Sequence, residues 1–570
     1  MRQTTCKSMQ CWSTLVRVLF VQNVRINVQM SVLDSSEGVF SLDRPVTPPN
    51  PDPDISARPA DKPTPFVKRI ASVRLPDDVS EVKVSKMAKL WKLDFTHGDA
   101  FVDGEFTLIT NIFKPPFSVE LSLLSKMNTY HHATGWNDLP SEWTEDAAAS
   151  FLNSVVDDLK RVTGRNPCRS WISKYCNQIL PGSPIQRKPD IVLLDINHEE
   201  PIQWRNIRAV TEVTRSKTEI DRIVDTINDK TFIMFTTQFN RTFIPMISIF
   251  DTRLRLTVTD RQGQLRSNVY NLFGPHPTHA YHLIVLLATL CFGSPKDIGY
   301  DPTVITNARD ETTDIICDNV VYRVIKCIYA VQSLVGRATH VFLVKSDGQL
   351  FILKDSWIEQ SRKSDEKRHL KRIQGVRGVP VLHQGWDVKI SDNLLTTWLI
   401  RNDFYGIIER SRVRRRLVSS SIGVPISQFQ TKKELISAFR DITESAYCTL
   451  HQGITANFDC IALYLISTDH NTVHRDISYN NVMLFNTQDT KTMLRRGLLI
   501  DFDYAAKIND KGKGSPGDRT VRTSLSIHYH GYSNLLFREP LLSWHWISYS
   551  IHRKRSSIIP GLTWSPSFTS

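Results

Sequence analysis

One stretch, residues 473–506, constrains the fold of this chain more than any other. It begins Val-His-Arg-Asp-Ile-Ser-Tyr-Asn-Asn-Val-Met-Leu and, after a polar turn, continues Gly-Leu-Leu-Ile-Asp-Phe-Asp-Tyr-Ala-Ala. Each of its two short apolar runs brings a carboxylate into a loop, Asp476 in the first and Asp501 in the second. Four residues separate Asp476 from Asn481, so a carboxylate and an amide share one turn.

These residue types suit phosphoryl transfer. A carboxylate such as Asp476 can orient an attacking hydroxyl and accept its proton, and Asn481 and Asp501 offer the hard oxygen ligands that Mg²⁺ prefers. His474 and Arg475 would support the loop. The alternative is a turn in which Asn and Asp serve only the turn itself. His-Arg-Asp alone does not decide between the two, but together with Asn481 and the apolar-Asp-Phe run it favours the catalytic interpretation.

The two segments resemble the fungal-type protein kinase family, within the protein-kinase-like superfamily. The resemblance implies an ATP- and Mg²⁺-dependent transferase that phosphorylates Ser or Thr of a protein substrate. It implies that Asp476 and Arg475 are catalytic and that Asn481 and Asp501 bind the metal. Compared with ordinary kinases, Ser478 replaces a phosphate-contacting Lys and Asp503 replaces the Gly of Asp-Phe-Gly.

The resemblance places the rest of a nucleotide site earlier in the chain. Residues 334–344 are expected to form a strand, a tight loop and a returning strand, with the amides around Gly336 covering phosphates. Residues 350–354 are expected to form a strand that ends in Lys354, which would contact the α- and β-phosphates. Lys354-Asp355-Ser356-Trp357 resembles a signature of the family.

A helix over residues 360–373 should carry the acidic partner of Lys354. Glu366 is the predicted partner; alternatively, it pairs with Lys367 or Arg368 on a solvated face, where an ion pair contributes only about 0–1 kcal/mol.

Three further segments follow in this half of the chain. The basic run Arg410–Arg416 is interpreted as a solvated strand approach in preference to an anion contact. Residues 422–426 are expected to enter a hinge in which the backbone groups of Ile422 and Val424 bind adenine. Residues 432–450 are expected to form a capped amphipathic helix.

Residues 81–310 are predicted to form an α/β region. Apolar residues repeat at helical spacing over 147–162, and continuous apolar runs predict strands at 191–195 and 207–213. The sequence also predicts a helix at 218–233, a strand pair at 254–258 and 269–272, and a buried helix at 280–292. The resemblance assigns this region to the family without giving its role.

A second hypothesis comes from Asp190, which follows Pro189, and from Glu212 on the next strand. They resemble the Pro-Asp…(Asp/Glu)-x-Lys pattern of nuclease-like folds, in which two carboxylates hold Mg²⁺ and a Lys orients water. Here Thr214 occupies the Lys position, and the nearest basic residues are Arg215 and Lys217. A structural role for the two acids is therefore favoured over a nuclease.

Composition bounds the remaining choices. The nine cysteines form no paired pattern, which indicates reduced thiols and an intracellular protein, cytoplasmic or nuclear. The net charge of +13 is spread along the chain, so nucleic-acid binding is not expected. No apolar run is long enough to span a bilayer. Residues 1–80 are rich in Pro and are predicted to be a disordered tail.

The expected architecture is α+β: a bilobal protein-kinase-like domain over 315–523, preceded by the α/β region and the tail, and followed by an atypical segment, 524–570. Asp503 lies 67 residues before Ser570, about half of what a complete helical C-lobe needs. A truncated or aberrant C-lobe is therefore expected, with low stability. The alternatives are a truncated pseudokinase that binds nucleotide and a small-molecule phosphotransferase. Arg475 is also a candidate to bind a phosphorylated Thr520 or Thr523.

Overall fold

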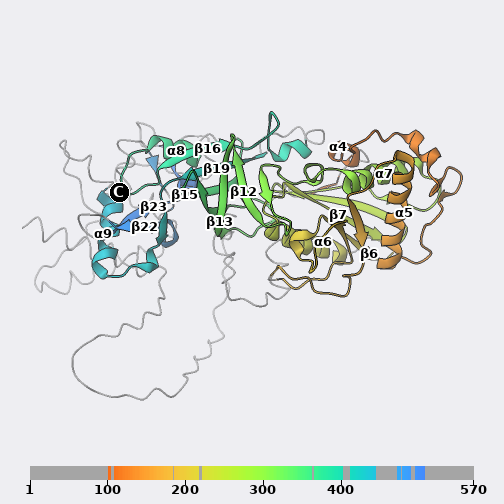
Figure 1. Ribbon diagram of the computed structural model, residues 1–570, viewed down its shortest axis with the longest axis horizontal. Coiled ribbons are helices and arrows are strands. Elements are labelled where there is room, and N and C mark those ends of the chain that lie inside the picture. The colour runs from red at the N-terminus through yellow and green to blue at the C-terminus, as the bar shows by residue number, and fades with distance from the viewer. Residues whose placement is uncertain are drawn as a thin grey trace, which may run out of the picture. The chain divides into compact units, whose positions relative to one another are not determined.

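The computed structural model describes residues 101–103, 108–183, 185–216, 221–361, 365–401, 411–444, 472–474, 476, 478–488 and 494–507. They fall into two compact units (Figure 1). The larger unit contains the described residues up to 361 and residues 383–419. The smaller unit contains residues 365–382 and the described residues from 420 onward. The predicted tail 1–80 and the segment 524–570 lie outside the described residues.

The first part of the larger unit is an eight-stranded sheet in the order β1-β9-β8-β7-β6-β5-β4, with β10 paired to β8. Strands β6 and β7 run parallel, and β4, β5 and β6 form an antiparallel series. The strands are β1 (Phe101–Asp103), β4 (Arg169–Ile172), β5 (Ile191–Asp195), β6 (Ala209–Thr214), β7 (Phe243–Phe250), β8 (Arg253–Asp260), β9 (Gln264–Arg266) and β10 (Tyr270–Asn271). A separate short pair is formed by β2 (Tyr130–His131) and β3 (Gly135–Trp136).

Among the described residues, four α-helices accompany this sheet: α4 (Leu108–Ile112), α5 (Glu145–Thr163), α6 (Asp221–Thr237) and α7 (Pro277–Phe292). Helix α5 begins where the Thr144 side chain accepts a hydrogen bond from the Ala147 N–H at 3.2 Å, and it ends at Gly164 with φ 70°. Helix α7 is apolar on all sides and is buried along most of its length, as expected from its sequence. Among the described helices, none combines the length and apolarity needed to cross a membrane.

The predictions for this region are largely confirmed. The expected helix at 147–162 is α5, and the strand at 191–195 is β5 residue for residue. The expected strand at 207–213 begins two residues late as β6, and the helix at 218–233 is α6 with shifted ends. Strand β7 was not predicted, although all eight of its residues are buried.

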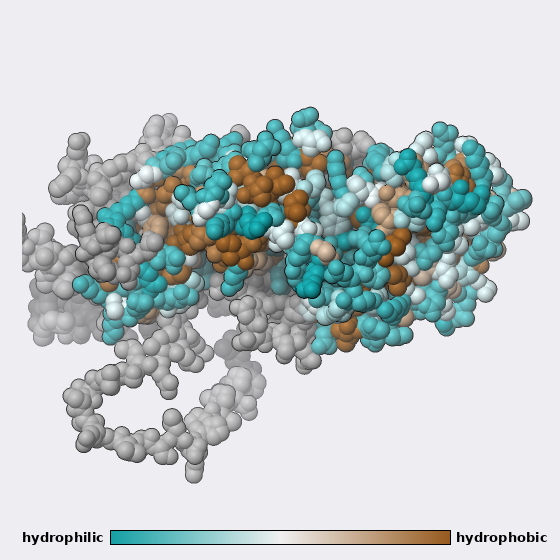
Figure 2. All heavy atoms as spheres, viewed as in Figure 1, coloured by the Kyte–Doolittle hydropathy of each residue, from teal (hydrophilic) through white to brown (hydrophobic). Residues whose placement is uncertain are grey.

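The second part of the larger unit is a seven-stranded sheet in the order β11-β12-β13-β14-β15-β19-β16. Its strands are β11 (Val304–Thr306), β12 (Thr312–Cys317), β13 (Val320–Ala330), β14 (His340–Ser346), β15 (Gln349–Glu359), β16 (Leu382–Asp387) and β19 (Arg412–Ser419). A short antiparallel pair of strands, β17 (Lys389–Ile390) and β18 (Asn393–Leu394), lies between β16 and β19 in the sequence. Figure 2 shows a mostly hydrophilic visible surface over the α/β region. Hydrophobic side chains gather on the visible surface over the second sheet.

The loop between β13 and β14 packs into the α/β region. Leu334 and Val335 were expected to begin a strand, and that prediction is wrong: both lie in the loop and are buried in a core cluster with residues of β5, β6 and α6. The Arg261 guanidinium donates to the Ser333 carbonyl at 2.7 Å, and the Gly336 N–H donates to the Arg261 carbonyl at 2.9 Å. Burial of two apolar side chains outweighs the local strand pattern of the sequence.

The interpretation of the basic run as a solvated strand approach is also wrong where the chain is described. Residues from Arg412 onward form strand β19, and Arg414 and Arg416 are at most 1% exposed. Both guanidinium groups bind the carboxylates of Asp301 and Asp355, which are equally buried. The alternation of the strand thus directs two arginines inward, where partners from distant segments neutralise them.

The smaller unit has a three-stranded sheet, β20-β22-β23, and a two-stranded one, β21-β24. Its elements are α8 (Glu366–Arg372), β20 (Gly423–Pro425), α9 (Lys432–Glu444), β21 (Thr472–Val473), β22 (Val482–Gln488), β23 (Arg495–Leu499) and β24 (Ala506–Lys507). Residues 375–381, which follow α8, form turns and coil. Helix α9 starts as predicted, and residues 445–450 of that prediction lie outside the described residues.

Candidate functional site

His474 anchors the loop that the sequence singled out. Its imidazole is fully buried, and it lies edge-on to the Phe502 ring with centroids 4.5 Å apart. The Asp476 N–H donates to His474 Nδ1 at 3.3 Å, so Nε2 carries the proton and donates to the Ile500 carbonyl at 3.0 Å. His474 therefore joins the loop to the end of β23.

Asn481 closes the same loop from its other end. Its side-chain Nδ2 donates to the Asp476 carbonyl at 2.8 Å, and its own carbonyl accepts the Ile500 N–H at 2.8 Å. The Asp476 side chain is half-buried. The predicted residues Asp476 and Asn481 are therefore brought together, directly beside the backbone that leads into Asp501.

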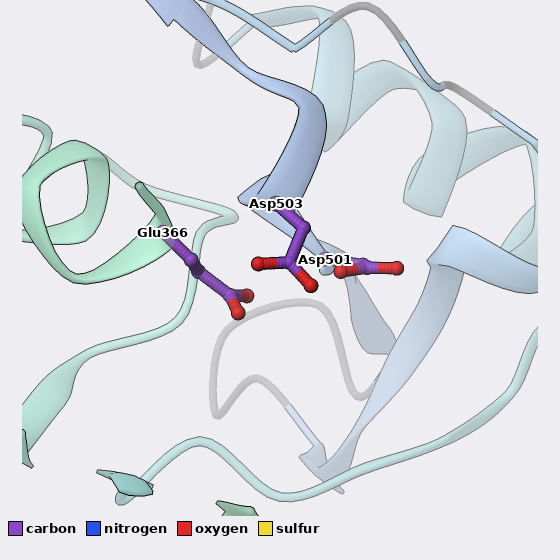
Figure 3. A group of neighbouring side chains, drawn as sticks. All are labelled: Glu366, Asp501 and Asp503. Atoms are coloured by element: carbon purple, nitrogen blue, oxygen red, sulfur yellow. The ribbon is translucent and has the colours of Figure 1, made fainter. Parts of the chain in front are cut away.

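Three carboxylates meet where β23 ends (Figure 3). One oxygen from each of Glu366, Asp501 and Asp503 lies within 4.8 Å of the others. Asp501 has φ 65°, in the left-handed region that Asp tolerates better than most residues. That backbone turn buries Phe502 completely, and the Phe502 N–H donates to Glu366 Oε1 at 3.2 Å. Helix α8 supplies Glu366, so two segments far apart in sequence build the cluster.

This cluster fits a divalent cation of the magnesium type. Glu366 is 6% exposed and Asp503 3% exposed, whereas Asp501 is half-buried. Carboxylate oxygens are the ligands that Mg²⁺ prefers, and a cation reduces the repulsion among negative groups held this close. Sequence reasoning had noted Asp503 only as a departure from Asp-Phe-Gly. Its position two residues after Asp501 was the available signal.

Helix α9 holds β23 in place behind the site. Arg495 donates from Nε to Glu434 Oε1 at 2.8 Å and from Nη2 to Oε2 at 3.0 Å, and this pair lowers the pKa of Glu434 to about 2. Gly497 lets the helix approach closely, because a Cβ there would lie 2.1 Å from the Ala438 carbonyl oxygen. The strand that presents Asp501 is thus fixed by an ion pair and by close backbone packing.

Lys354 and Gly336 belong to the larger unit. Lys354 is half-buried on β15, opposite Val341 of β14 and Leu417 of β19. Asp355, the next residue of the predicted signature, faces the buried arginines instead. Gly336 lies in the loop packed on the α/β region, where its N–H is already bound to the Arg261 carbonyl.

Of the remaining predicted residues, Ile422 and Val424 lie beside or in the three-stranded sheet of the smaller unit. Val424 pairs with Leu484 in β20–β22, and the Ile422 carbonyl accepts the Asn486 N–H at 2.9 Å. Arg475, Thr520 and Thr523 lie outside the described residues.

A basic residue that sequence reasoning missed lies in the α/β region. Lys230 of α6 contacts the Glu212 carboxylate and lies 3.8 Å from Asp190 Oδ1. The sequence pattern pointed to Thr214 and to the neighbouring Arg215 and Lys217. Only the packing of α6 against the sheet shows that a lysine eighteen residues after Glu212 reaches both acids.

A loop that holds a carboxylate and an amide, next to a strand ending at clustered carboxylates, is typical of a phosphoryl-transfer protein. A family model described as fungal protein kinase matches residues 188–407 and 401–529, which together span more than half of the chain. The chain therefore belongs to the fungal protein kinase family. A search of curated proteins found no match.

Proposed function

We propose that this protein transfers the γ-phosphate of ATP to a Ser or Thr hydroxyl of a protein substrate, with Mg²⁺ as the metal. The observation that carries the proposal is the closed loop in which His474 and Asn481 fix Asp476 beside the backbone that leads from β23 to Asp501. Catalysis of phosphoryl transfer depends mainly on positioning and electrostatics, and hydrogen bonds of this kind supply the positioning.

Asp476 is the group that acts on the attacking hydroxyl. It accepts the hydroxyl proton as the hydroxyl oxygen forms its bond to the γ-phosphorus and the bond to the β–γ bridging oxygen breaks. Its main chain is held from both sides, by His474 through the N–H and by Asn481 through the carbonyl. The side chain therefore starts close to a working orientation, which lowers the entropic part of the barrier.

Asp501 and Asp503, with Glu366 beside them, are the proposed metal ligands. Mg²⁺ bound there would neutralise charge on the phosphate oxygens. The 6% exposure of Glu366 and its hydrogen bond from the Phe502 N–H support a ligand or positioning role at the cluster. The earlier prediction, in which Glu366 holds Lys354, remains part of the proposal, as do phosphate contact by Lys354 and adenine contact by Ile422 and Val424. Gly336 is left out of the phosphate contacts, because its N–H is bound to the Arg261 carbonyl.

The test uses the full chain with Mg²⁺ and ATP. Thermal unfolding is followed with and without nucleotide, and phosphate transfer is followed with labelled ATP and a mixed Ser/Thr protein substrate. We expect ATP to raise the unfolding midpoint of the wild type, since a ligand that binds only the native state stabilises it. D501N and K354M should lose this shift, and D476N should keep it while transfer falls roughly 10²–10⁴-fold.

Matched controls are D392N and K389M, which change exposed side chains of the larger unit in the same chemical way. Both should retain the ATP shift and the transfer rate. Stabilisation by ATP without any transfer would replace the kinase proposal with a nucleotide-binding protein. A folded wild type that ATP does not stabilise would refute the nucleotide site altogether.

A further inference from the structure

A second charged cluster lies within the α/β region, built from Asp190, Glu212 and Lys230. Asp190 immediately precedes β5, Glu212 lies in β6 and Lys230 in α6. The Val213 N–H donates to Asp190 Oδ2 at 2.9 Å. Asp190 is thus fixed to the strand that carries Glu212, and Lys230 contacts the Glu212 carboxylate and lies 3.8 Å from Asp190 Oδ1.

The three residues share the sheet face that α6 covers. Val192 lies two residues after Asp190 and Val210 two residues before Glu212, so each valine shares a face of the sheet with its acid. Both valines belong to the same core cluster as Ile227 and Ile233 of α6. Lys230 lies between these two helix positions at a spacing of three, so it also faces the sheet. The charged cluster therefore occupies one end of an otherwise apolar layer.

Such a buried charged group is costly to keep for packing alone. Lys230 is 2% exposed and Glu212 3% exposed. Replacing a buried ionic group by apolar residues of similar size is often neutral or stabilising, so the apolar layer would be served as well by Leu or Met.

The cluster is accessible at one point and has basic neighbours. The Asp190 side chain is 26% exposed, and Lys188, two residues earlier, is exposed. Ser248 pairs with Glu212 across β6–β7, and Arg255 pairs with Ser248 across β7–β8, so the arginine shares the same face two strands away. A negatively charged substrate would be attracted to this end of the sheet.

We infer that Asp190, Glu212 and Lys230 form a divalent-cation site that hydrolyses phosphodiester bonds of nucleic acid. The cation binds the two carboxylates, and Lys230 leaves Glu212 and contacts a phosphate oxygen. The cation-bound water loses its proton to solvent, and the hydroxide forms a new bond to phosphorus. The bond from phosphorus to one ester oxygen breaks, and that oxygen takes a proton from solvent. Nothing is oxidised or reduced.

The experiment uses the full chain, Mn²⁺ as the metal probe, and two substrates: supercoiled plasmid DNA and single-stranded RNA, both without ATP. We expect Mn²⁺-dependent cleavage of at least one substrate by the wild type. D190N and K230M should each reduce the rate at least about 100-fold. Electron paramagnetic resonance of free Mn²⁺ should show that D190N binds one equivalent less than the wild type.

The matched control is D157N, which makes the same chemical change at an exposed position of α5 and should leave cleavage and Mn²⁺ binding unchanged. Circular dichroism checks the fold, and D190N keeps the inference testable if K230M fails to fold, because its amide preserves the shape of a partly exposed side chain. Absence of Mn²⁺-dependent cleavage by the wild type would overturn the inference. So would equal cleavage by D190N, or loss of Mn²⁺ binding in D190N with no cleavage by any form. These results are independent of phosphate transfer from ATP.

Discussion

Replacement of Asp355 by Asn should destabilise the larger unit far more than the loss of an ion pair on its surface. Asp355 is 1% exposed and accepts hydrogen bonds from Arg414 Nε at 3.0 Å and from Arg416 Nε at 2.6 Å. Asp301 Oδ2 accepts from Arg414 Nη1 at 3.0 Å and Arg416 Nη2 at 2.8 Å. Two cations and two anions make the network neutral. Burial opposes ionisation of Asp355, but the two arginines lower its pKa below the ordinary value.

The magnitude follows from the charge left behind. The amide of D355N keeps the shape of the side chain but leaves two buried guanidinium groups with one carboxylate. Removing one partner of a buried pair typically costs about 3–5 kcal/mol, a large part of the roughly 5–15 kcal/mol that stabilises a domain. With a urea dependence of about 3 kcal/mol per molar, the unfolding midpoint should fall by about 1–2 M.

The assay is urea unfolding of the full chain, followed by tryptophan fluorescence. The control is E142Q, which breaks the pair between Glu142 and Arg215, whose side chains are 63% and 72% exposed. That loss should cost only about 0–1 kcal/mol. The double variant D355L/R416M leaves Arg414 paired with Asp301 and should recover part of the loss. A D355N midpoint no lower than that of E142Q would refute the reasoning.

Three further predictions concern packing and pH. Leu334→Ala should cost about 2–5 kcal/mol in urea unfolding because the side chain is fully buried, whereas Leu350→Ala, at 43% exposure, should cost much less; equal costs would contradict the packing of this loop. Gly497→Ala should lower the thermal midpoint by the equivalent of about 1–3 kcal/mol, since its Cβ would meet the Ala438 carbonyl, and an unchanged midpoint would show that α9 can shift freely. Arg495 depresses the pKa of Glu434 from 4.5 to about 2, so this pair stabilises the fold above pH 4.5 and loses that contribution as the pH falls toward 2. Glu434→Gln should therefore flatten the acid-unfolding profile in this range, and an unaltered profile would assign the acid sensitivity to other groups.

Much of the candidate site follows from local sequence. Asp476, Asn481 and Asp501 lie within one short stretch, and the hydrogen bonds that join them are made between near neighbours or paired strands. Helix α5 and strand β5 were predictable because their apolar spacing is regular and their burial agrees with it.

The structural features that could not be predicted from the sequence depend on partners from distant segments. The alternation of Arg414 and Arg416 along β19 is the same whether they face water or a buried anion, and only the return of Asp301 and Asp355 to that face decides it. Lys230 reaches Glu212 because of the helical register of α6, which no residue spacing within β6 reveals. The apolar pattern at Leu334 and Val335 predicts a strand, but these side chains are buried in a core built by other elements. Local sequence does not show which core buries an apolar residue.

The packing of the β13–β14 loop limits how the gene for this protein can recombine. Leu334 and Val335 complete a core whose other members come from β5, β6 and α6, and the amide of Gly336 is held by Arg261. A recombination event that joined the second sheet to a different upstream region would expose two apolar side chains and vacate part of a core at once. Selection should therefore keep the α/β region and the second sheet together in one gene. The family match agrees with this, since it begins at residue 188, inside the α/β region, and continues without a break through β15. Shuffled or shortened versions of this gene should be rare among its descendants unless they keep this joint intact.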